Sequence, residues 1–140
     1  MLDASPARVS QALNLSLRED VLVEKCTGRR VCGECGKGYN VADINRPADA
    51  ARGLPSIVMP PLLPPAKCAG KMETRADDTE EVVRARLAVY RAQCGPVEEL
   101  YRSSGRLVEF PVLGGIPETL PRLLKLVLEL VRQERARVAK

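Results

Sequence analysis

The sequence predicts an α/β fold with a small β-rich insertion, and three observations indicate it. Residues 12–17 and 106–112 have the apolar pattern of β-strands. Each of these segments precedes a stretch with helical periodicity, an order that is typical of a parallel sheet flanked by helices. Between these two units, residues 31–73 contain most of the prolines and show no helical period. We therefore expect this part of the chain to form a loop-and-hairpin insertion.

The first unit is a short strand followed by a helix. Residues 12–17, ALNLSL, alternate apolar and polar side chains, as a half-buried strand does. Ser16 lies three residues before Glu19, which is the spacing of a capping box, so we expect the helix to begin here. Gly28 gives this helix a plausible end.

The second unit contains more helix. Residues 74–93 combine an acidic first turn with an apolar stripe, which predicts a helix whose dipole the carboxylates stabilise. Pro96 predicts the start of a second, shorter helix that ends at Gly105. Residues 106–112, RLVEFPV, predict a strand, and the following glycines turn the chain into a final helix from about Pro117.

The composition limits the classes of function. The chain has 140 residues, of which 45% are hydrophobic and 29% charged, so it forms one domain or part of one. Aromatic residues make up 3%, too few for a platform that stacks nucleic-acid bases. The absence of histidine excludes histidine-based acid–base catalysis. The net charge of +4 fits an anionic ligand such as a nucleotide, and no apolar run is long enough to cross a bilayer.

The segment RRVCGECGKGYNV, residues 29–41, carries signals for three chemistries. A phosphate-binding loop needs lysine followed by serine or threonine at the start of a helix, but Lys37 is followed by Gly38 and no helix begins there. No other part of the sequence offers a better phosphate loop. A redox pair is also disfavoured, because Cys32 and Cys35 do not begin a helix that would lower a thiol pKa.

The third chemistry is metal binding. Cys32 and Cys35 have the spacing at which two thiolates share one zinc ion, but Cys68 stands alone where a second pair is needed. We therefore expect a reduced hairpin without metal. The five cysteines include only one close pair and no secretory signal precedes them, which favours a reducing compartment over a disulfide framework.

The arginines allow two interpretations. Arg29 and Arg30 follow the first helix. Arg75 lies near the start of residues 74–93, before the apolar stripe of the predicted helix begins. Arg86 lies beside that stripe. A guanidinium group is planar and donates paired hydrogen bonds to phosphate oxygens, so the arrangement of these arginines is compatible with phosphate binding. Solvated surface charge explains the same residues equally well.

Several of these segments together resemble a known family. LREDVLVEKCTGRRVCGECGKGYNV, TRADDTEEVVRARLAVYRAQCGPVEELYRSSGRLVEF and GGIPE are similar, in order and spacing, to the C-terminal part of adenylate kinases of the plant chloroplast type. The resemblance covers the chain from Leu13 to about Leu130. It implies a partial P-loop nucleoside monophosphate kinase core at residues 1–30 and 74–140, with a mobile lid at residues 31–73.

The resemblance also implies roles for individual residues. Those it assigns to catalysis are Arg29, Arg75 and Arg86; to ATP binding, Arg29, Gly38, Tyr39 and Ile116; and to AMP binding, Gln11, Arg75 and Arg86. It places Cys32, Cys35 and Cys68 at three of the four zinc-ligand positions seen in zinc-bearing members, with Pro65 at the fourth, so we expect no zinc. The implied reaction is phosphoryl transfer from ATP with Mg²⁺ to AMP, giving ADP.

The sequence departs from the family pattern at its start. The phosphate loop is absent, and Asp3, Pro6 and Gln11 look like remnants of an AMP-binding stretch in which Ala7 replaces an arginine. We therefore expect an incomplete chain without turnover of its own. Two alternatives stay open: a non-catalytic nucleotide-binding or kinase-interacting module, and a small zinc-knuckle protein. The resemblance further implies a monomer in the chloroplast stroma, or otherwise in the cytoplasm, without nucleic-acid or membrane partners.

Overall fold

The computed structural model describes residues 9–139, so Asp3, Pro6 and Ala7 lie outside the described residues. The elements, in chain order, are β1 (Ala12–Ser16), α1 (Glu19–Thr27), β2 (Arg29–Cys32), β3 (Gly38–Asn40), β4 (Ile44–Arg46), the 3₁₀ helix η1 (Ala50–Arg52), β5 (Ile57–Met59), α2 (Ala66–Ala69), β6 (Met72–Glu73), α3 (Glu80–Ser103), β7 (Leu107–Pro111) and α4 (Ile116–Val138).

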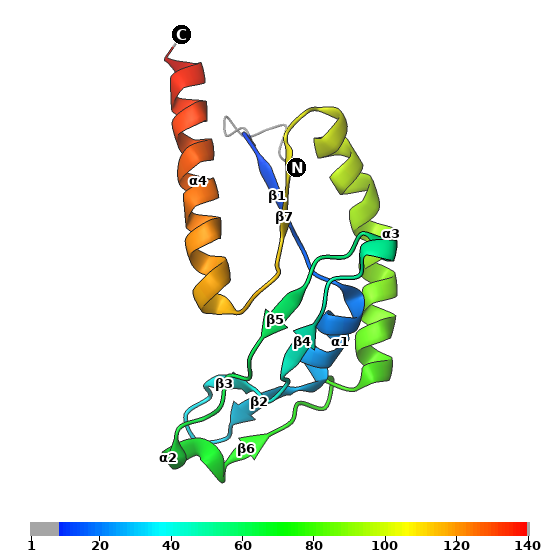
Figure 1. The fold of residues 1–140 in the computed structure, drawn as a ribbon, viewed down its shortest axis with the longest axis vertical. Coiled ribbons are helices and arrows are strands. Elements are labelled where there is room, and N and C mark those ends of the chain that lie inside the picture. The colour runs from blue at the N-terminus through cyan, green and yellow to red at the C-terminus, as the bar shows by residue number, and fades with distance from the viewer. Residues whose placement is uncertain (1–8, 140) are drawn as a thin grey trace, which may run out of the picture.

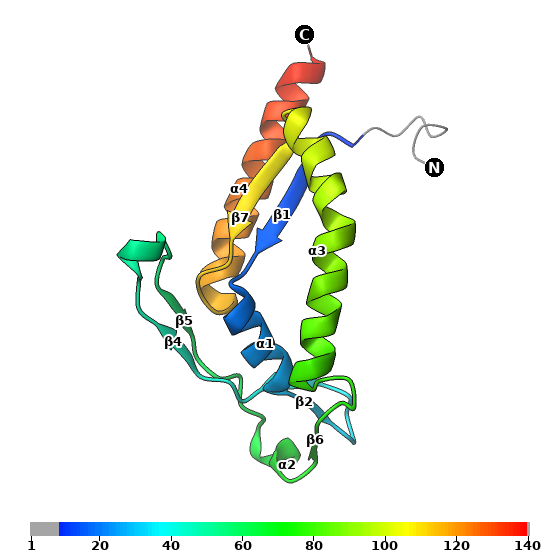
Figure 2. The ribbon, with the colours of Figure 1, turned by 90° about the vertical axis from the view of Figure 1, so that its right-hand side faces the viewer.

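A parallel sheet of β1 and β7 forms the middle of the upper half of the molecule in Figure 1. The register runs from Ala12 opposite Leu107 to Ser16 opposite Pro111. Helices α3 and α4 stand on opposite sides of this pair of strands (Figure 1 and Figure 2). The predicted α/β fold is confirmed, with each predicted strand forming one half of the sheet.

The insertion folds into antiparallel strands, as its proline-rich pattern predicted. β2 pairs with β3 on one side and β6 on the other, while β4 and β5 form a separate hairpin. The main hydrophobic core lies where this hairpin meets α1, with Val21 of α1 against Ile44 and Ile57. All three side chains are at most 1% exposed. Burying each contributes roughly 1.5–3 kcal/mol, so this core fixes the hairpin to the helix.

Two details of the helices correct the predictions. Helix α1 begins at Glu19 and its N-cap is Arg18, which makes no side-chain capping bond, so the predicted capping box at Ser16 is wrong. Ser16 is instead the last residue of β1, where the ladder to β7 uses its backbone.

The second correction concerns Pro96. One helix, α3, runs continuously from Glu80 to Ser103 with Pro96 inside it, so the predicted second helix is wrong. A proline disfavours helical backbone at the preceding residue because its ring crowds that residue's N–H and its Cβ. Gly95 has no Cβ, so the helix continues through the proline at the loss of one hydrogen bond.

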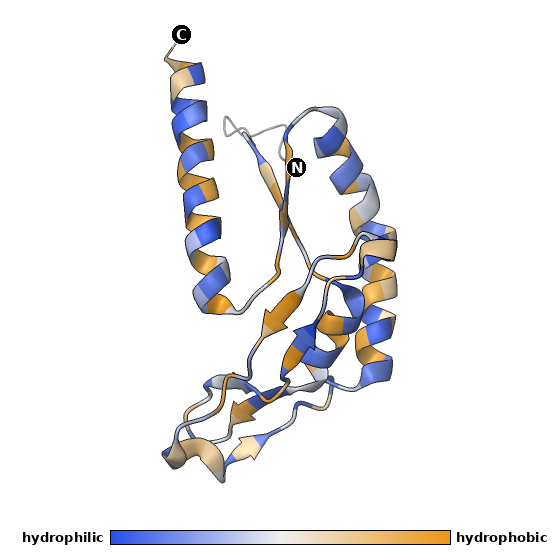
Figure 3. Cartoon of the chain, viewed as in Figure 1, coloured by the Kyte–Doolittle hydropathy of each residue, from blue (hydrophilic) through white to orange (hydrophobic). Residues whose placement is uncertain are grey.

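Helix α4 keeps an apolar face at the surface. Figure 3 shows orange bands along this helix, and it has no buried residue. Leu124 and Leu128 are more than half exposed. A groove of about 620 Å³ separates α4 from β1 and is lined by apolar side chains such as Leu13, Val127 and Val131. No helix within residues 9–139 is long and apolar enough to cross a membrane.

Candidate functional site

The candidate site is built around a tight turn between β6 and α3. The backbone N–H of Asp78 donates to the carbonyl of Arg75 at 3.1 Å, which closes the turn. Thr79 then caps α3, because its side chain accepts from the N–H of Val82. The cap fixes where the helix begins, and the turn holds Arg75, Asp77 and Asp78 together just before it.

Two of the predicted arginines meet at Asp77. Arg75 donates from both Nε and Nη2 to the two carboxylate oxygens of Asp77, each at 3.0 Å. Arg86, two turns into α3, approaches the same carboxylate through Nη1 at 3.3 Å. The hydrogen bonds from Arg75 hold the pKa of Asp77 below its usual range. All three side chains are exposed, so a ligand can reach them.

The third arginine meets the neighbouring aspartate. Arg29 is the first residue of β2, and its Nε lies 3.4 Å from Asp78 Oδ2. The Asp78 side chain is 1% exposed, and neither carboxylate oxygen has a hydrogen-bond partner within the described part of the chain. The ion pair with Arg29 is therefore the interaction that compensates this buried charge. Arg29, Arg75, Arg86, Asp77 and Asp78 are called the arginine cluster below.

The sequence did not single out Asp78. Its position suggested one more carboxylate in the acidic first turn of a helix, and it instead lies before the helix and turns inward. The signal that could have found it is the pair of adjacent aspartates, because neighbouring side chains in a turn point in different directions and can meet different arginines.

A groove of about 690 Å³ opens beside the arginine cluster, and Arg29 and Arg86 are part of its wall. The C-terminal end of β1, helix α1 and helix α3 supply the other lining residues, which are Asn14, Leu15, Ser16, Leu17, Glu19, Leu22, Cys26, Val83, Leu87, Tyr90, Arg91 and Glu98. The two glutamates are engaged, Glu19 with Arg91 and Glu98 with Arg102. The wall of the groove is therefore apolar in part and carries guanidinium groups in another part.

The structure places two further predicted residues near β2 and two elsewhere. In β3, Gly38 lies opposite Val31, two residues along from Arg29, and Tyr39 lies opposite Arg30, one residue along. Ile116 begins α4 and is 68% exposed. Gln11 precedes β1 and lines the groove between β1 and α4, at the opposite end of the strand from the arginine cluster. The structure therefore brings the three arginines together and leaves Gln11 apart from them.

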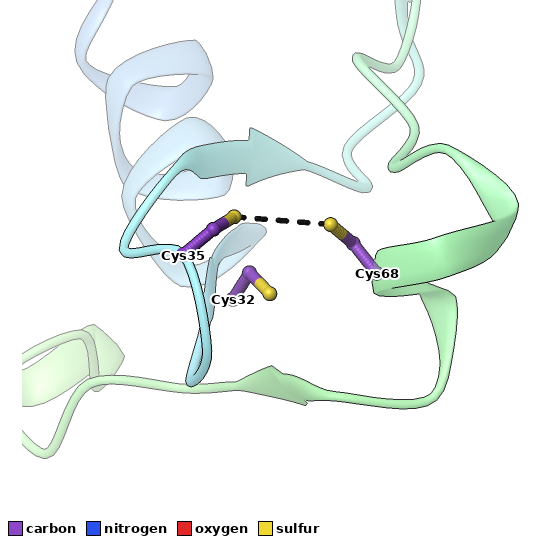
Figure 4. Close-up of side chains that lie close together, drawn as sticks. All are labelled: Cys32, Cys35 and Cys68. Atoms are coloured by element: carbon purple, nitrogen blue, oxygen red, sulfur yellow. Dashed lines mark hydrogen bonds between the residues drawn. The ribbon is translucent and has the colours of Figure 1, made fainter.

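The three cysteines of the insertion converge (Figure 4). Sγ atoms of Cys32, Cys35 and Cys68 lie within 4.8 Å of one another. Backbone N–H groups, that of Cys35 above all, lower the pKa of Cys32 to about 7, whereas burial raises the pKa of Cys68. The Tyr39 hydroxyl lies 3.9 Å from Cys68 Sγ, and burial raises the pKa of this phenol.

These thiols supply three of the four ligands that a closed structural zinc site requires. Pro65 has no donor atom at the position predicted for the fourth. Within residues 9–139, no carboxylate joins the three sulfurs. The residues present therefore do not fit a closed four-ligand zinc site, and the absence of zinc stays a prediction.

Comparison with known proteins decides the relationship of the chain. It is 52% identical, over 99% of its length, to a probable chloroplastic adenylate kinase 1 of Oryza sativa subsp. japonica. It is 56% identical over 84% of its length to the chloroplastic adenylate kinase 1 of Arabidopsis thaliana, and 48% identical over 96% to an adenylate kinase of Solanum tuberosum. The chain is a homologue of the chloroplast-type adenylate kinases. No family model matches it.

This adenylate kinase homologue spans about half the length of the curated relatives it matches, 50% of the rice protein and 40% of the Arabidopsis protein. The resemblance inferred from the sequence is thus confirmed. The fold agrees with it, since a parallel sheet with flanking helices is what a partial nucleoside monophosphate kinase core contains. Adenylate kinases use ATP with Mg²⁺ and bind ATP, AMP and ADP.

Proposed function

We propose that this chain supplies the arginines that bind nucleotide phosphates in the adenylate kinase reaction, ATP + AMP ⇌ 2 ADP. The observation that carries the proposal is the meeting of Arg29, Arg75 and Arg86 at two adjacent aspartates beside a groove. Arg75 and Arg86 share the Asp77 carboxylate, Arg29 pairs with the adjacent Asp78, and Arg29 and Arg86 both line the groove, which supports a common role for the three guanidinium groups.

The cluster can accept phosphate by exchange. Arg75 and Arg86 share the single Asp77 carboxylate, and these contacts lie at the surface, where solvent screens them. A phosphate group carries more charge and more acceptor oxygens than one carboxylate, so it competes well for the same guanidinium forks. Arg29 keeps Asp78 as its partner through Nε, while its Nη2 donates to Cys26 Sγ at 3.8 Å and its side chain is 37% exposed.

Phosphoryl transfer benefits from such a cluster because charge spreads over the equatorial oxygens of the transferred group. Fixed guanidinium groups stabilise that charge without reorganising when the reaction occurs. The arginines would also orient the donor and acceptor phosphates. The Mg²⁺ would arrive with the nucleotide, since the glutamates of the groove are already paired with arginines.

The remaining roles follow from the same proposal. Residues 31–73 would act as the lid, with Gly38 and Tyr39 near ATP, and Ile116 would meet the adenine through its backbone. Arg75 and Arg86 would also contact AMP, whereas Gln11 is separated from them in this structure. The setting would be the chloroplast, since the rice and Arabidopsis relatives are chloroplastic, with the stroma as the compartment and a monomer as the active unit.

A second function is supported by one observation: these 140 residues contain no glycine-rich phosphate loop ending in Lys-Ser or Lys-Thr. The alternative is a module that binds nucleotide, or docks on a kinase chain, without turnover. An assay of ADP formation by the purified chain separates the two. ADP production that depends on Arg86 supports catalysis, and binding without ADP production supports the alternative.

Isothermal titration of the chain with ATP tests the shared part of both functions. We expect saturable binding that Arg86→Ala weakens on the order of tenfold or more, because one charge-assisted contact is lost. Arg84→Ala is the matched control. Arg84 lies two residues before Arg86 in the same helix and is also exposed, but its ion-pair partner is Glu80. Equal effects of the two substitutions would contradict the proposal.

A further inference from the structure

The second cluster of reactive side chains is the cysteine group of the insertion, which the proposed function does not use. Cys35 lies in the turn between β2 and β3, and Cys68 lies in α2, 33 residues later in the sequence. Their sulfurs are 3.8 Å apart and face one another in Figure 4. A disulfide needs about 2.05 Å, so small rotations of two side chains would bring the atoms into bonding range.

The backbone holds these two segments side by side. Cys32 of β2 is opposite Met72 of β6 in the antiparallel ladder. The N–H of Gly33 donates to the carbonyl of Lys71 at 2.9 Å, and the Lys71 ammonium pairs with Glu34. The turn that carries Cys35 and the segment after α2 are thus joined by residues directly beside the two thiols, which keeps the sulfurs close together.

Exposure distinguishes the three cysteines. Cys35 is exposed, whereas Cys32 is 1% and Cys68 3% exposed. An oxidant in solution therefore meets Cys35 first. Of its two neighbours, Cys68 is the one whose sulfur lies in direct contact with Cys35. Exposure and the distance between the sulfurs therefore both favour a pairing of Cys35 with Cys68.

We propose that Cys35 and Cys68 form a reversible disulfide by exchange with a small disulfide such as glutathione disulfide. The Cys35 thiolate attacks one glutathione sulfur, which forms a mixed disulfide and releases one glutathione thiolate. The Cys68 thiolate then attacks the Cys35 sulfur and releases the second glutathione. The two cysteines lose two electrons and two protons, and the glutathione disulfide becomes two glutathione thiols.

The disulfide would link the β2–β3 turn covalently to α2. Because Tyr39 of β3 contacts Cys68, the link would also restrain the strand that carries Gly38 and Tyr39. A cross-link that closes a loop of this length chiefly restricts the unfolded chain, so the oxidised form is expected to unfold at a higher denaturant concentration than the reduced form.

The test uses the full chain, reduced, freed of metal with a chelator and equilibrated in mixtures of glutathione and glutathione disulfide. After alkylation of free thiols, digestion and mass spectrometry identify any linked peptides. We expect a Cys35–Cys68 link and the loss of two of the five free thiols. The link should persist in Cys32→Ser and in the remote control Cys94→Ser, and disappear in Cys35→Ser. Cys35 is exposed, so its serine variant keeps the fold, which circular dichroism verifies.

Three outcomes would overturn the inference. The first is the absence of any intramolecular link at every ratio of the two glutathione forms. The second is a dominant link that includes Cys32, shown by its loss in Cys32→Ser. The third is stoichiometric zinc that stays bound through gel filtration of the chain before chelation and protects Cys35 and Cys68 from the glutathione disulfide.

Discussion

The insertion differs from the half of the molecule that contains β1, β7, α3 and α4, called the sheet half below. The two regions bury their apolar side chains to different extents. In the insertion, Ile44 and Ile57 pack on Val21 of α1 and are at most 1% exposed. In the sheet half, Leu124 and Leu128 of α4 are 53% and 56% exposed, although the helix is long and strongly amphipathic. The insertion closes a core against α1, whereas the sheet half leaves an apolar helix face and a groove at the surface.

This difference shows which part of the chain positions the arginine cluster. Arg29 belongs to β2 and Arg75 to the turn after β6, so both depend on the region with the closed core. Arg86 is in the first half of α3, which packs beside α1. The cluster therefore relies on the better-packed region, and the exposed face of α4 is distant from it along the fold (Figure 1).

The largest effect is expected from removing core atoms in the closed region. Ile44→Ala should lower the free energy of unfolding by about 2–5 kcal/mol, because the side chain is fully buried and a cavity remains. Leu128→Ala, the matched control in the open region, should change it by less than about 0.5 kcal/mol. Urea unfolding followed by circular dichroism measures both. Similar losses in the two variants would remove the contrast between the regions.

The next largest effect concerns the buried carboxylate of the cluster. Arg29→Ala should cost about 1–3 kcal/mol of stability, because the Asp78 carboxylate then stays buried without a cationic partner. Replacing the carboxylate as well, in Arg29→Ala with Asp78→Asn, should recover part of that loss. A double variant less stable than the sum of the two single variants would show that the pair does not compensate the buried charge.

A smaller effect is expected at the exposed groove between β1 and α4. The dye ANS binds accessible apolar surface, so we expect it to fluoresce with the folded chain. Val131→Lys places a charge in the groove and should reduce this fluorescence by roughly half while leaving stability within about 0.5 kcal/mol. The control is Val58→Lys, since Val58 is exposed in the insertion and outside this groove. An equal reduction in both variants would place the dye elsewhere.

The smallest effect is a dependence on acid pH. Arg75 holds the pKa of the Asp77 carboxyl below the usual value for an aspartate, so the ionised carboxylate is favoured by folding. The associated stabilisation is present above that value and is lost as the pH falls through the lowered pKa of the folded chain. Titration of the Asp77 carboxyl by NMR, with Arg75→Ala for comparison, measures it. A pKa that does not rise in Arg75→Ala would contradict the assigned cause.

Local patterns predicted most of the secondary structure. Alternation in residues 12–17 and the apolar run in 106–112 predicted both strands of the sheet. Side chains of a strand alternate between its two faces regardless of the partner strand, so the pattern is visible in the sequence. The pattern failed at Pro96, where a neighbouring glycine relieved the clash that normally ends a helix. It also failed at Ser16, where strand pairing took the residue that a capping box would have used.

The site was predicted in part, and the missed portion depends on contacts distant in sequence. Arg29, Arg75 and Arg86 could be named from the resemblance, and the structure brings them together. The burial of Asp78 could not be read from its neighbours, because it results from β2 passing beside the turn before α3. The approach of Cys68 to Cys35 likewise depends on how the insertion folds back on itself.

In the proposed function, nucleotide phosphates replace Asp77 as the partner of Arg75 and Arg86 and also contact Arg29. The most direct measurement follows the Nε–H signals of the arginines by NMR during titration with ATP. We expect Arg29, Arg75 and Arg86 to shift together and saturate at one ATP concentration, while Arg137, paired with Glu134 in α4, stays unchanged. Shifts of equal size at Arg137, or none at the three cluster arginines, would contradict it.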